Sequence, residues 1–391
     1  MKAKILRFLI YLSFSLLSIY LVEHLLLSQR FMQIFNINEH VTSDIYFNDL
    51  YYYKYDEDHA SDFMKKQKEV VLVNTQDIGI NERYKYNELL TRLLKYNPKC
   101  IGVDVTFNKN KADELKDFHR NKKIVFAQGA ANDIQYPNVG NAEFPKVHEH
   151  NQRTIRFYSN STESFAYKLA HIAYPTKNLK IGPENEFLIH FNSINNGISH
   201  IRKDYEDKLN YPKNFHYMNS QELVEDSLEI FKEGIENKIV IIGYLGDQDH
   251  FGAKYDIEDK FRIPADTKHL INKEPVMNGA VIHAVAISNM LNPSEQFTVI
   301  PDFWIRLFQL LICCVFLVLL LFYQFGKLLN RFLLFALSIP LLFLVLFLMD
   351  HLIFVKLGGT LFALLIIEEM FEILEPFEHK YFPKLMQHEK K

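Results

Sequence analysis

The sequence predicts an α/β fold: an extracytoplasmic domain with a mainly parallel sheet flanked by helices, plus four transmembrane helices, one N-terminal and three C-terminal. Four long apolar stretches, one at the start and three at the end, flank a polar region. Within that region short β-branched runs alternate with helical patterns, which favours parallel strands joined by crossovers. Several of the runs are apolar at every position, as in sheets buried on both faces.

The first apolar stretch, residues 5–27, has the length of a membrane span. A helix needs about 20 residues to cross the roughly 30 Å hydrocarbon core of a bilayer. The stretch exceeds the about 7–15 apolar residues at the centre of a signal peptide, and no small-residue cleavage site follows it. We therefore expect an uncleaved signal anchor over residues 1–29.

The other three apolar stretches are residues 303–325, 332–349 and 352–373. They predict a three-helix transmembrane bundle over residues 303–373, followed by a short cytoplasmic tail over residues 374–391. Basic residues precede the first span and separate the second from the third: Lys2, Lys4, Arg7, Lys327 and Arg331. Because such residues stay on the cytoplasmic side, we expect both termini in the cytoplasm and residues 30–302 outside it.

Composition limits the function classes that fit this chain. The net charge of −3 gives no electrostatic footprint for nucleic acid, so no nucleic-acid partner is expected. Cys100 is the only cysteine between residues 30 and 302, so this region has no cysteine partner for an internal disulfide. The outer domain must therefore rely on its hydrophobic core.

In the first half of the outer domain, residues 36–68 are polar and are predicted to form a linker. Strands are then predicted over residues 70–74, 100–105 and 123–127, and helices over residues 86–94 and 111–120. The helix over residues 86–94 rests on leucines at helical spacing, and the strands on β-branched runs bounded by turn residues.

In the second half, helices are predicted over residues 164–173, 220–231 and 280–290, and strands over residues 187–191 and 238–243. A long loop runs from the strand at 238–243 to Pro275. The linker over residues 291–302 contains Pro293 and Pro301, which stiffen it because each fixes its own φ.

Polar residues follow several of the predicted strands, and ligands of open parallel sheets lie outside the carboxyl ends of the strands. We therefore expect a ligand-binding site made of Asp77, Asp104, Gln128, Gly243, Asp247, Asp249 and His250. The alternative is that these carboxylates are solvated or cap the helices that follow. Both interpretations remain open at the level of sequence.

Enzymatic chemistry has weaker support. Asp247, Asp249 and His250 offer oxygen and imidazole ligands, but their spacing, like that of His148 and His150, matches no strong metal signature, so no metal is assigned. No glycine-rich phosphate loop precedes a helix, and no Gly-x-Ser-x-Gly motif is present. We expect no catalytic residues and no cofactor. His283, among apolar neighbours, is expected to be a core histidine.

Four segments carry a resemblance to a known family. They are Ile-Gly-Val-Asp-Val-Thr-Phe at residues 101–107, Lys-Ile-Val-Ile-Ile-Gly at 238–243, Asp-Lys-Phe-Arg-Ile-Pro at 259–264, and Met-Asn-Gly-Ala-Val-Ile-His-Ala at 277–284. Together with one span before the domain and three after it, they resemble the CHASE domain of type two, an extracytoplasmic sensor module of bacterial kinases and cyclases. The resemblance covers residues 41–376.

The resemblance implies sensing of an unknown small ligand from the bacterial inner membrane, with no family catalytic residues. Members of the family often continue into a kinase, cyclase or phosphatase domain, whereas this sequence ends at Lys391, shortly after its last span. We therefore expect a separate partner protein to supply the output. Two alternatives stay open: a structural or assembly subunit of an envelope complex, and a metal-dependent envelope enzyme using Asp77, Asp104 and residues 247–250.

Overall fold

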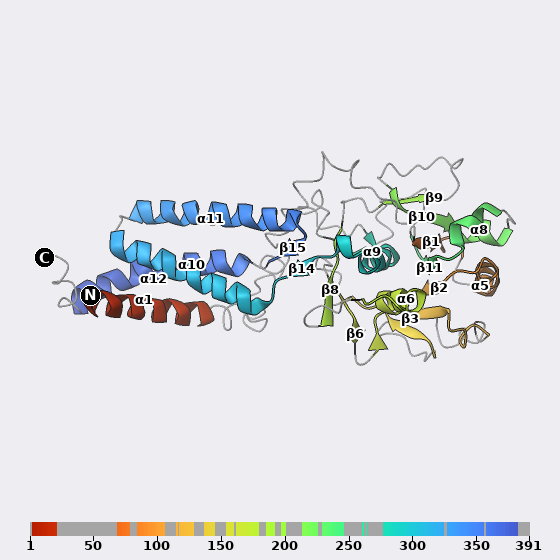
Figure 1. Cartoon of the computed structure of the whole chain (residues 1–391), viewed down its shortest axis with the longest axis horizontal. Coiled ribbons are helices and arrows are strands. Elements are labelled where there is room, and N and C mark those ends of the chain that lie inside the picture. The colour runs from red at the N-terminus through yellow and green to blue at the C-terminus, as the bar shows by residue number, and fades with distance from the viewer. Residues whose placement is uncertain are drawn as a thin grey trace. The chain divides into compact units, whose positions relative to one another are not determined.

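A computed structural model divides the chain into two compact units (Figure 1). We call Tyr52–Phe297 the α/β unit, and Met1–Tyr51 with Thr298–Lys391 the helical unit. The structure describes residues 2–21, 69–78, 84–105, 115, 117–128, 137–144, 154–159, 162–179, 185–191, 197–200, 213–225, 229–245, 260–261, 263, 277–323, 327–355 and 357–381. The predicted linker over residues 36–68 lies outside these residues.

The α/β unit is built on a seven-stranded sheet of order β4-β3-β2-β11-β1-β10-β9. Its strands are β1 (Val70–Asn74), β2 (Cys100–Asp104), β3 (Ile124–Gln128), β4 (Val139–Asn141), β9 (Gly197–His200), β10 (Lys213–Asn219) and β11 (Ile239–Gly243). Every neighbouring pair in this sheet is parallel. The predicted parallel sheet is therefore confirmed.

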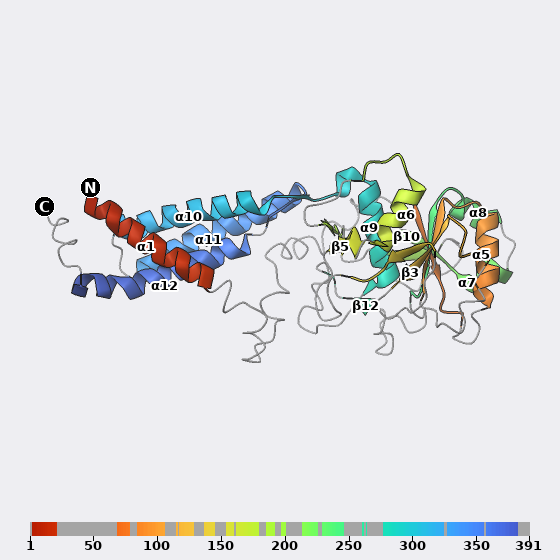
Figure 2. The same ribbon diagram turned by 90° about the horizontal axis from the view of Figure 1, so that it is seen from below.

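Helices cover both faces of this sheet (Figure 2), as the apolar strands require. On one face, Leu89, Leu90 and Leu93 of α5 (Lys85–Lys95) share a buried cluster with Val71, Val103 and other strand residues. On the other face lie α6 (Phe165–Ala173) and α9 (Gly279–Leu291). Predicted helices at 86–94, 164–173 and 280–290 are thus confirmed within a residue at each end.

Ser164 begins α6 as the sequence pattern suggests, because its hydroxyl oxygen accepts a hydrogen bond from the Tyr167 amide at 3.2 Å. The same helix packs closely on the sheet. A Cβ added to Gly102 of β2 would lie 2.6 Å from side-chain atoms of Leu169 and Phe165. A larger residue would force the ends of these two side chains to move, so the packing of α6 favours glycine at this position of the Ile-Gly-Val-Asp segment.

Two predictions for this unit need correction. The helix predicted over residues 111–120 is described only at residues 115 and 117–120, which have 3-10 and turn conformations, and there the Phe118 amide donates to the Leu115 carbonyl at 2.9 Å. Such i to i+3 bonding is typical of short turns, and Leu115 and Phe118 both pack against the core. The helix predicted over residues 220–231 is confirmed at every described residue, in α7 (Ser220–Glu225) and α8 (Glu229–Ile235).

The predicted strand over residues 187–191 is shorter and lies outside the main sheet. It is β8 (Glu186–Leu188), which pairs antiparallel with β5 (Thr154–Arg156). Its Phe187 packs edge-on against Phe157, with ring centroids 5.9 Å apart, and the strand beside β1 in the seven-stranded sheet is β10. The short strands β6 (Tyr158–Ser159) and β7 (Thr162–Glu163) form a second antiparallel pair, and β12 (Lys260–Phe261) and β13 (Met277–Asn278) a third.

The helical unit contains α1 (Lys2–Leu21), α10 (Asp302–Tyr323), α11 (Lys327–Asp350) and α12 (Gly358–Tyr381). These helices share one cluster of buried side chains, which includes Tyr11, Phe316, Leu341 and Ile367. The segments Asp302–Leu321 and Leu328–Asp350 are long and apolar enough to cross a membrane, with mean hydropathies of 2.5 and 2.9. In α1 the apolar segment Ile5–Tyr20 is shorter. Four spans thus stay a prediction.

The start of the predicted fourth span, residues 352–373, was wrong. Helix α12 begins only at Gly358, and β15 (Ile353–Phe354) precedes it. Strand β15 pairs in parallel with β14 (Thr298–Val299), which lies in the linker before α10. Backbone pairing with a distant segment therefore overrides the apolar pattern at this turn.

Candidate functional site

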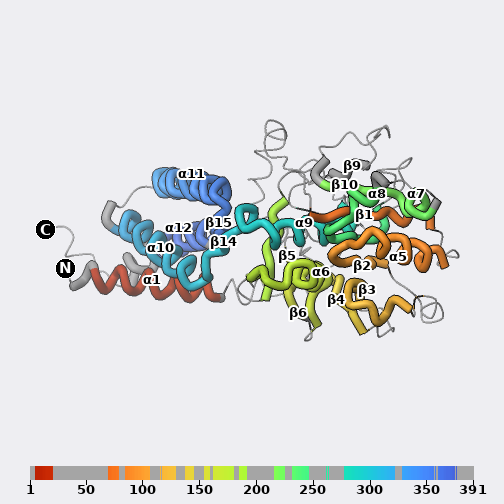
Figure 3. The backbone as a smooth tube through the Cα atoms, turned by 45° about the vertical axis from the view of Figure 1, so that its right-hand side comes forward, coloured from red at the N-terminus to blue at the C-terminus, as the bar shows by residue number. Residues whose placement is uncertain are grey.

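Because neighbouring strands are parallel, the carboxyl ends of the central strands lie at one edge of the sheet, which we call the carboxyl edge. Figure 3 shows the backbone paths of β1, β2 and β3 within this unit. Asn74, the last residue of β1, is in register with Asn219 of β10 and with Gly243 of β11. Gly243 is in turn in register with Asp104 of β2. The structure therefore brings Asp104 and Gly243, predicted separately from sequence, next to each other.

Gln128 ends β3, the next strand along, and is in register with Asn141 of β4. Asp104 and Gln128 are half-buried, and Asp77 is half-buried in the turn after β1. Asp247, Asp249 and His250 lie outside the described residues, as do His148 and His150. Their roles as ligands of a small molecule or a metal remain predictions.

Asn74 is a residue of this edge that sequence reasoning missed. It is 2 % exposed, and its Oδ1 accepts hydrogen bonds from the amides of Gln76 at 3.2 Å and Leu245 at 3.1 Å. The side chain thereby joins the turn after β1 to the loop after β11. The sequence did contain a signal for this residue. Asn74 ends a strand whose other four residues are apolar, and a side-chain amide buried in such a strand must be hydrogen-bonded.

Helix α9 begins at the same edge. Asn278, its N-cap residue, donates from Nδ2 to the Tyr244 carbonyl at 3.3 Å. A Cβ added to Gly243 would lie 2.7 Å from the Cβ of Ala280 and 3.6 Å from that of Asp104. Gly243 therefore lets the first turn of α9 approach β11, which gives this predicted site residue a packing role.

His283 is buried in α9, as expected of a core histidine, with 2 % of its surface exposed. Its ring stacks on Phe144 with centroids 4.8 Å apart and meets Phe165 edge-on at 5.1 Å. Burial lowers the pKa of His283 to about 4, against the opposing effect of a hydrogen bond with the backbone of Ala142. The imidazole is therefore neutral at neutral pH.

A second buried histidine, His190, was missed by the sequence analysis. Its ring lies edge-on to Phe297 with centroids 4.6 Å apart, and its Nδ1 is 3.2 Å from the Glu295 carbonyl oxygen. Desolvation lowers its pKa to about 4, and the hydrogen bond to Glu295 opposes that effect. No sequence signal marked it, because its contacts come from the linker after α9.

The carboxyl edge offers groups for hydrogen bonding. Among the residues that the structure describes, no group of three or more His, Cys, Asp or Glu side chains is placed to hold a metal ion. The carboxyl edge instead combines a carboxylate, amides and the start of a helix, which are groups that donate and accept hydrogen bonds. Such an edge is where open parallel sheets place their ligands.

The chain has no significant match among curated proteins or among solved structures. The model of one family, described as the CHASE2 domain, matches residues 24–321, which is more than half of the chain. This match starts and ends earlier than the range suggested by the four sequence segments, and it contains all four of them. Domains of this family are extracytoplasmic sensors. The chain therefore belongs to the CHASE2 family of sensor domains.

Proposed function

We propose that this protein is a membrane-anchored sensor that binds a small ligand at the carboxyl edge outside the cytoplasm and signals through a separate partner protein. The observation that carries the proposal is the register that places Asn74, Gly243 and Asp104 side by side where α9 begins. Membership of a sensor family supports the assignment of sensing to this unit.

The membrane topology is part of this proposal: four spans in the bacterial inner membrane, with both termini cytoplasmic. Large apolar side chains on α1, α10 and α11 are exposed, among them Leu17, Trp304, Leu311, Phe335 and Phe343. Water does not favour such surfaces, whereas lipid does. Lys2, Lys4, Lys327 and Arg331 supply the basic flanks of the cytoplasmic side.

Reporter fusions test the topology. A reporter that is active only outside the cytoplasm should be active when fused at Asn110 and inactive when fused at Lys391. A cytoplasmic reporter should give the opposite pattern. Cytoplasmic activity at Asn110 would place the α/β unit in the wrong compartment and remove the proposal.

The ligand and the partner need separate experiments. The full chain, purified in detergent, is screened by thermal unfolding against polar small molecules, and Asp104→Asn should abolish the stabilisation given by any true ligand. Crosslinking in the native membrane then identifies the partner. If partners are recovered but no compound stabilises the protein, the chain is an assembly subunit of an envelope complex. Metal-dependent turnover that Asp104→Ala removes would show an enzyme instead.

We also propose that the signal runs along α9 and the linker over residues 291–302 into α10. Helix α9 is buried along its whole length and is the last helix of more than one turn before α10. Several Gly and Ser residues inserted after Ser294 test this route. Ligand binding should persist while the response of the partner is lost, whereas spans that act only as an anchor would tolerate the insertion.

A further inference from the structure

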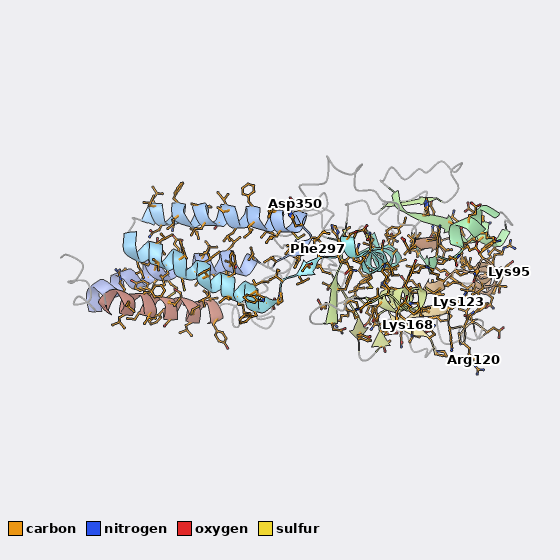
Figure 4. The ribbon with its side chains drawn as sticks, in the orientation of Figure 1. Lys95, Arg120, Lys123, Lys168, Phe297 and Asp350 are labelled. Atoms are coloured by element: carbon orange, nitrogen blue, oxygen red, sulfur yellow. The ribbon has the colours of Figure 1, made fainter. Side chains whose placement is uncertain are left out.

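The end of α9 is held by side chains from other parts of the α/β unit. The backbone amide of His190 donates to Asn289 Oδ1 at 2.8 Å, while its ring contacts the Glu295 carbonyl and the Phe297 ring. We call these four residues the exit clamp. All of them belong to the α/β unit, and Phe297, labelled in Figure 4, is its last residue.

Two further side chains fix the same segment. Lys177 Nζ donates to the carbonyl of Leu291, the last residue of α9. Gln296 Nε2 donates to the carbonyls of Asn289 and Met290, both at 3.0 Å. Helix ends leave carbonyls without intrahelical partners, and here side chains satisfy them. The chain therefore leaves α9 in a fixed path as far as Phe297.

The next residue, Thr298, begins a second set of contacts, which lie inside the helical unit. The Thr298 amide donates to the Leu352 carbonyl at 2.7 Å, and the Ile300 amide donates to the Phe354 carbonyl at 3.2 Å. Thr298 and Val299 are in register with Ile353 and Phe354. We call this pairing of β14 with β15 the linker clip. It joins the segment before α10 to the turn between α11 and α12.

The turn that receives the linker clip has an unusual backbone. Leu352 has a φ of 56°, in the left-handed region that a bulky residue rarely adopts. Such a conformation persists only where surrounding contacts hold it. The carbonyl of Leu352 is the one that accepts from Thr298, so the clip helps to hold this turn.

We propose that the linker clip carries the state of the α/β unit to the α11–α12 turn, in addition to the direct path into α10. One peptide bond separates the last residue of the exit clamp from the first residue of the clip. A displacement of α9 that releases the exit clamp therefore changes the backbone that β15 pairs with. This inference deepens the proposed function and rests on it, because it names how the sensor regulates its membrane helices.

A contact between the two helices gives the displacement a readout. Arg331, in the first turns of α11, has its Nε 3.6 Å from Oε1 of Glu368, which lies near the middle of α12. Glu368 is buried, and α12 shares its buried cluster with α1 and α10. A shift of the α11–α12 turn is thus a shift of two helices that are paired at a second point, and α12 also contacts α1 and α10.

Hydrogen exchange on the full chain in lipid nanodiscs tests the proposal without ligand or partner. His190→Ala opens the exit clamp and should raise exchange of the amides at residues 353–357 about tenfold, the effect of losing about one hydrogen bond's worth of protection. Asn289→Ala, which removes the acceptor for the His190 amide, should act in the same direction and serves if His190→Ala impairs folding.

Proline variants separate the clip from its surroundings. Ile300→Pro removes one of the two clip donors and leaves that of Thr298, so in that background His190→Ala should change exchange at residues 353–357 less than in the parent chain. Val299→Pro is the matched control, because alternate amides of a strand point to opposite sides and those of Thr298 and Ile300 point to β15. Coupling should survive in this control.

Three outcomes overturn the inference. One is unchanged exchange at residues 353–357 in both clamp variants. Another is a rise confined to the first turn of α10, which would leave α10 as the only path. The third is coupling of undiminished size in Ile300→Pro. None of these touches ligand binding or partner recovery, so the proposed function stands or falls by its own tests.

Discussion

The two edges of the seven-stranded sheet use polar residues in different ways. At the amino edge a lysine directly precedes each of β2, β3 and β11, namely Lys99, Lys123 and Lys238. Lys123 Nζ donates to Asn97 Oδ1 at 3.0 Å and to the Pro98 carbonyl at 3.2 Å, and Lys99 Nζ lies 3.5 Å from the centre of the Tyr174 ring. These cations hold loops together.

At the carboxyl edge the same strands end in Asp104, Gln128 and Gly243. There Asn74 joins the turn after β1 to Leu245, and Asn278 joins the start of α9 to Tyr244. Lysines that hold loops at the amino edge fit a stabilising role, and our proposal gives the carboxyl edge the binding role that it has in other parallel α/β folds. Substitutions at the two edges should therefore differ in what they damage.

Gly243→Val should have the largest effect on the free energy of unfolding. It tests whether the packing of α9 against the carboxyl edge requires a glycine at this position. The new Cβ would overlap the Cβ of Ala280, so we expect a loss of about 3 kcal/mol of unfolding free energy. Thermal unfolding of the full chain in detergent measures it. Gly243→Ala should be milder, and adding Ala280→Gly should recover part of the loss. A fully stable Gly243→Val would show that α9 does not fix this edge.

Acid should lower the free energy of unfolding through His283, which is buried in α9. The pKa of His283 is 6.5 in the unfolded chain and about 4 in the folded chain. Well above pH 6.5 the imidazole is neutral in both, so it adds no pH dependence to the free energy of unfolding there. Below pH 6.5 only the unfolded state gains the proton, and by pH 5 about 2 kcal/mol of stability is lost. Unfolding curves at pH 7 and pH 5 should therefore differ less in His283→Phe than in the parent chain. Equal differences would place the acid-sensitive group elsewhere.

Lys123→Met tests the amino edge. Removing a cation that donates to Asn97 and Pro98 should cost about 1 kcal/mol of unfolding free energy, a modest loss because Lys123 is largely exposed. Ligand-induced stabilisation should stay unchanged. Lys122→Met, at the exposed neighbouring position, is the control and should be within about 0.5 kcal/mol of the parent.

Asp104→Asn should have the smallest effect on folding. The side chain is half-buried and the substitution preserves its shape, so unfolding free energy should change by about 0.5 kcal/mol or less while ligand binding is lost. Comparison of thermal unfolding with the ligand screen gives both numbers. A strongly destabilised variant would mean that this carboxylate serves the fold, as the lysines of the amino edge do.

The strands could be predicted from sequence, but their order could not. The apolar runs of β1, β2 and β11 mark strands buried on both faces, and this pattern identified all three. Nothing local places β11 between β1 and β2, because that choice depends on packing across the whole unit. Strand β10 was not predicted either, since its run alternates aromatic and polar residues without a continuous apolar core.

The candidate site was predicted only in part, because some of its contacts also depend on packing across the whole unit. The rule that parallel strands end at one edge was enough to place Asp104 and Gly243 at the same edge, and the strand order then brings them into register. It did not give the hydrogen bonds of Asn74, whose partners lie in two loops, or those of His190, whose partners follow α9. Contacts between segments far apart in sequence decide such roles. The strand at Ile353–Phe354 was missed for this reason too, since its partner is β14.

The position of β11 also has a consequence for how the protein is made. Strands β1 and β2 are synthesised early, yet the strand that fills the gap between them is the last of the sheet to be synthesised. Until residue 243 has been exported, both strands present unpaired edges, which are prone to aggregate. The sheet therefore cannot close until β11 has been exported. A chaperone outside the cytoplasm that shields extended chains should raise the yield of this protein more than that of a protein whose strands pair in sequence order.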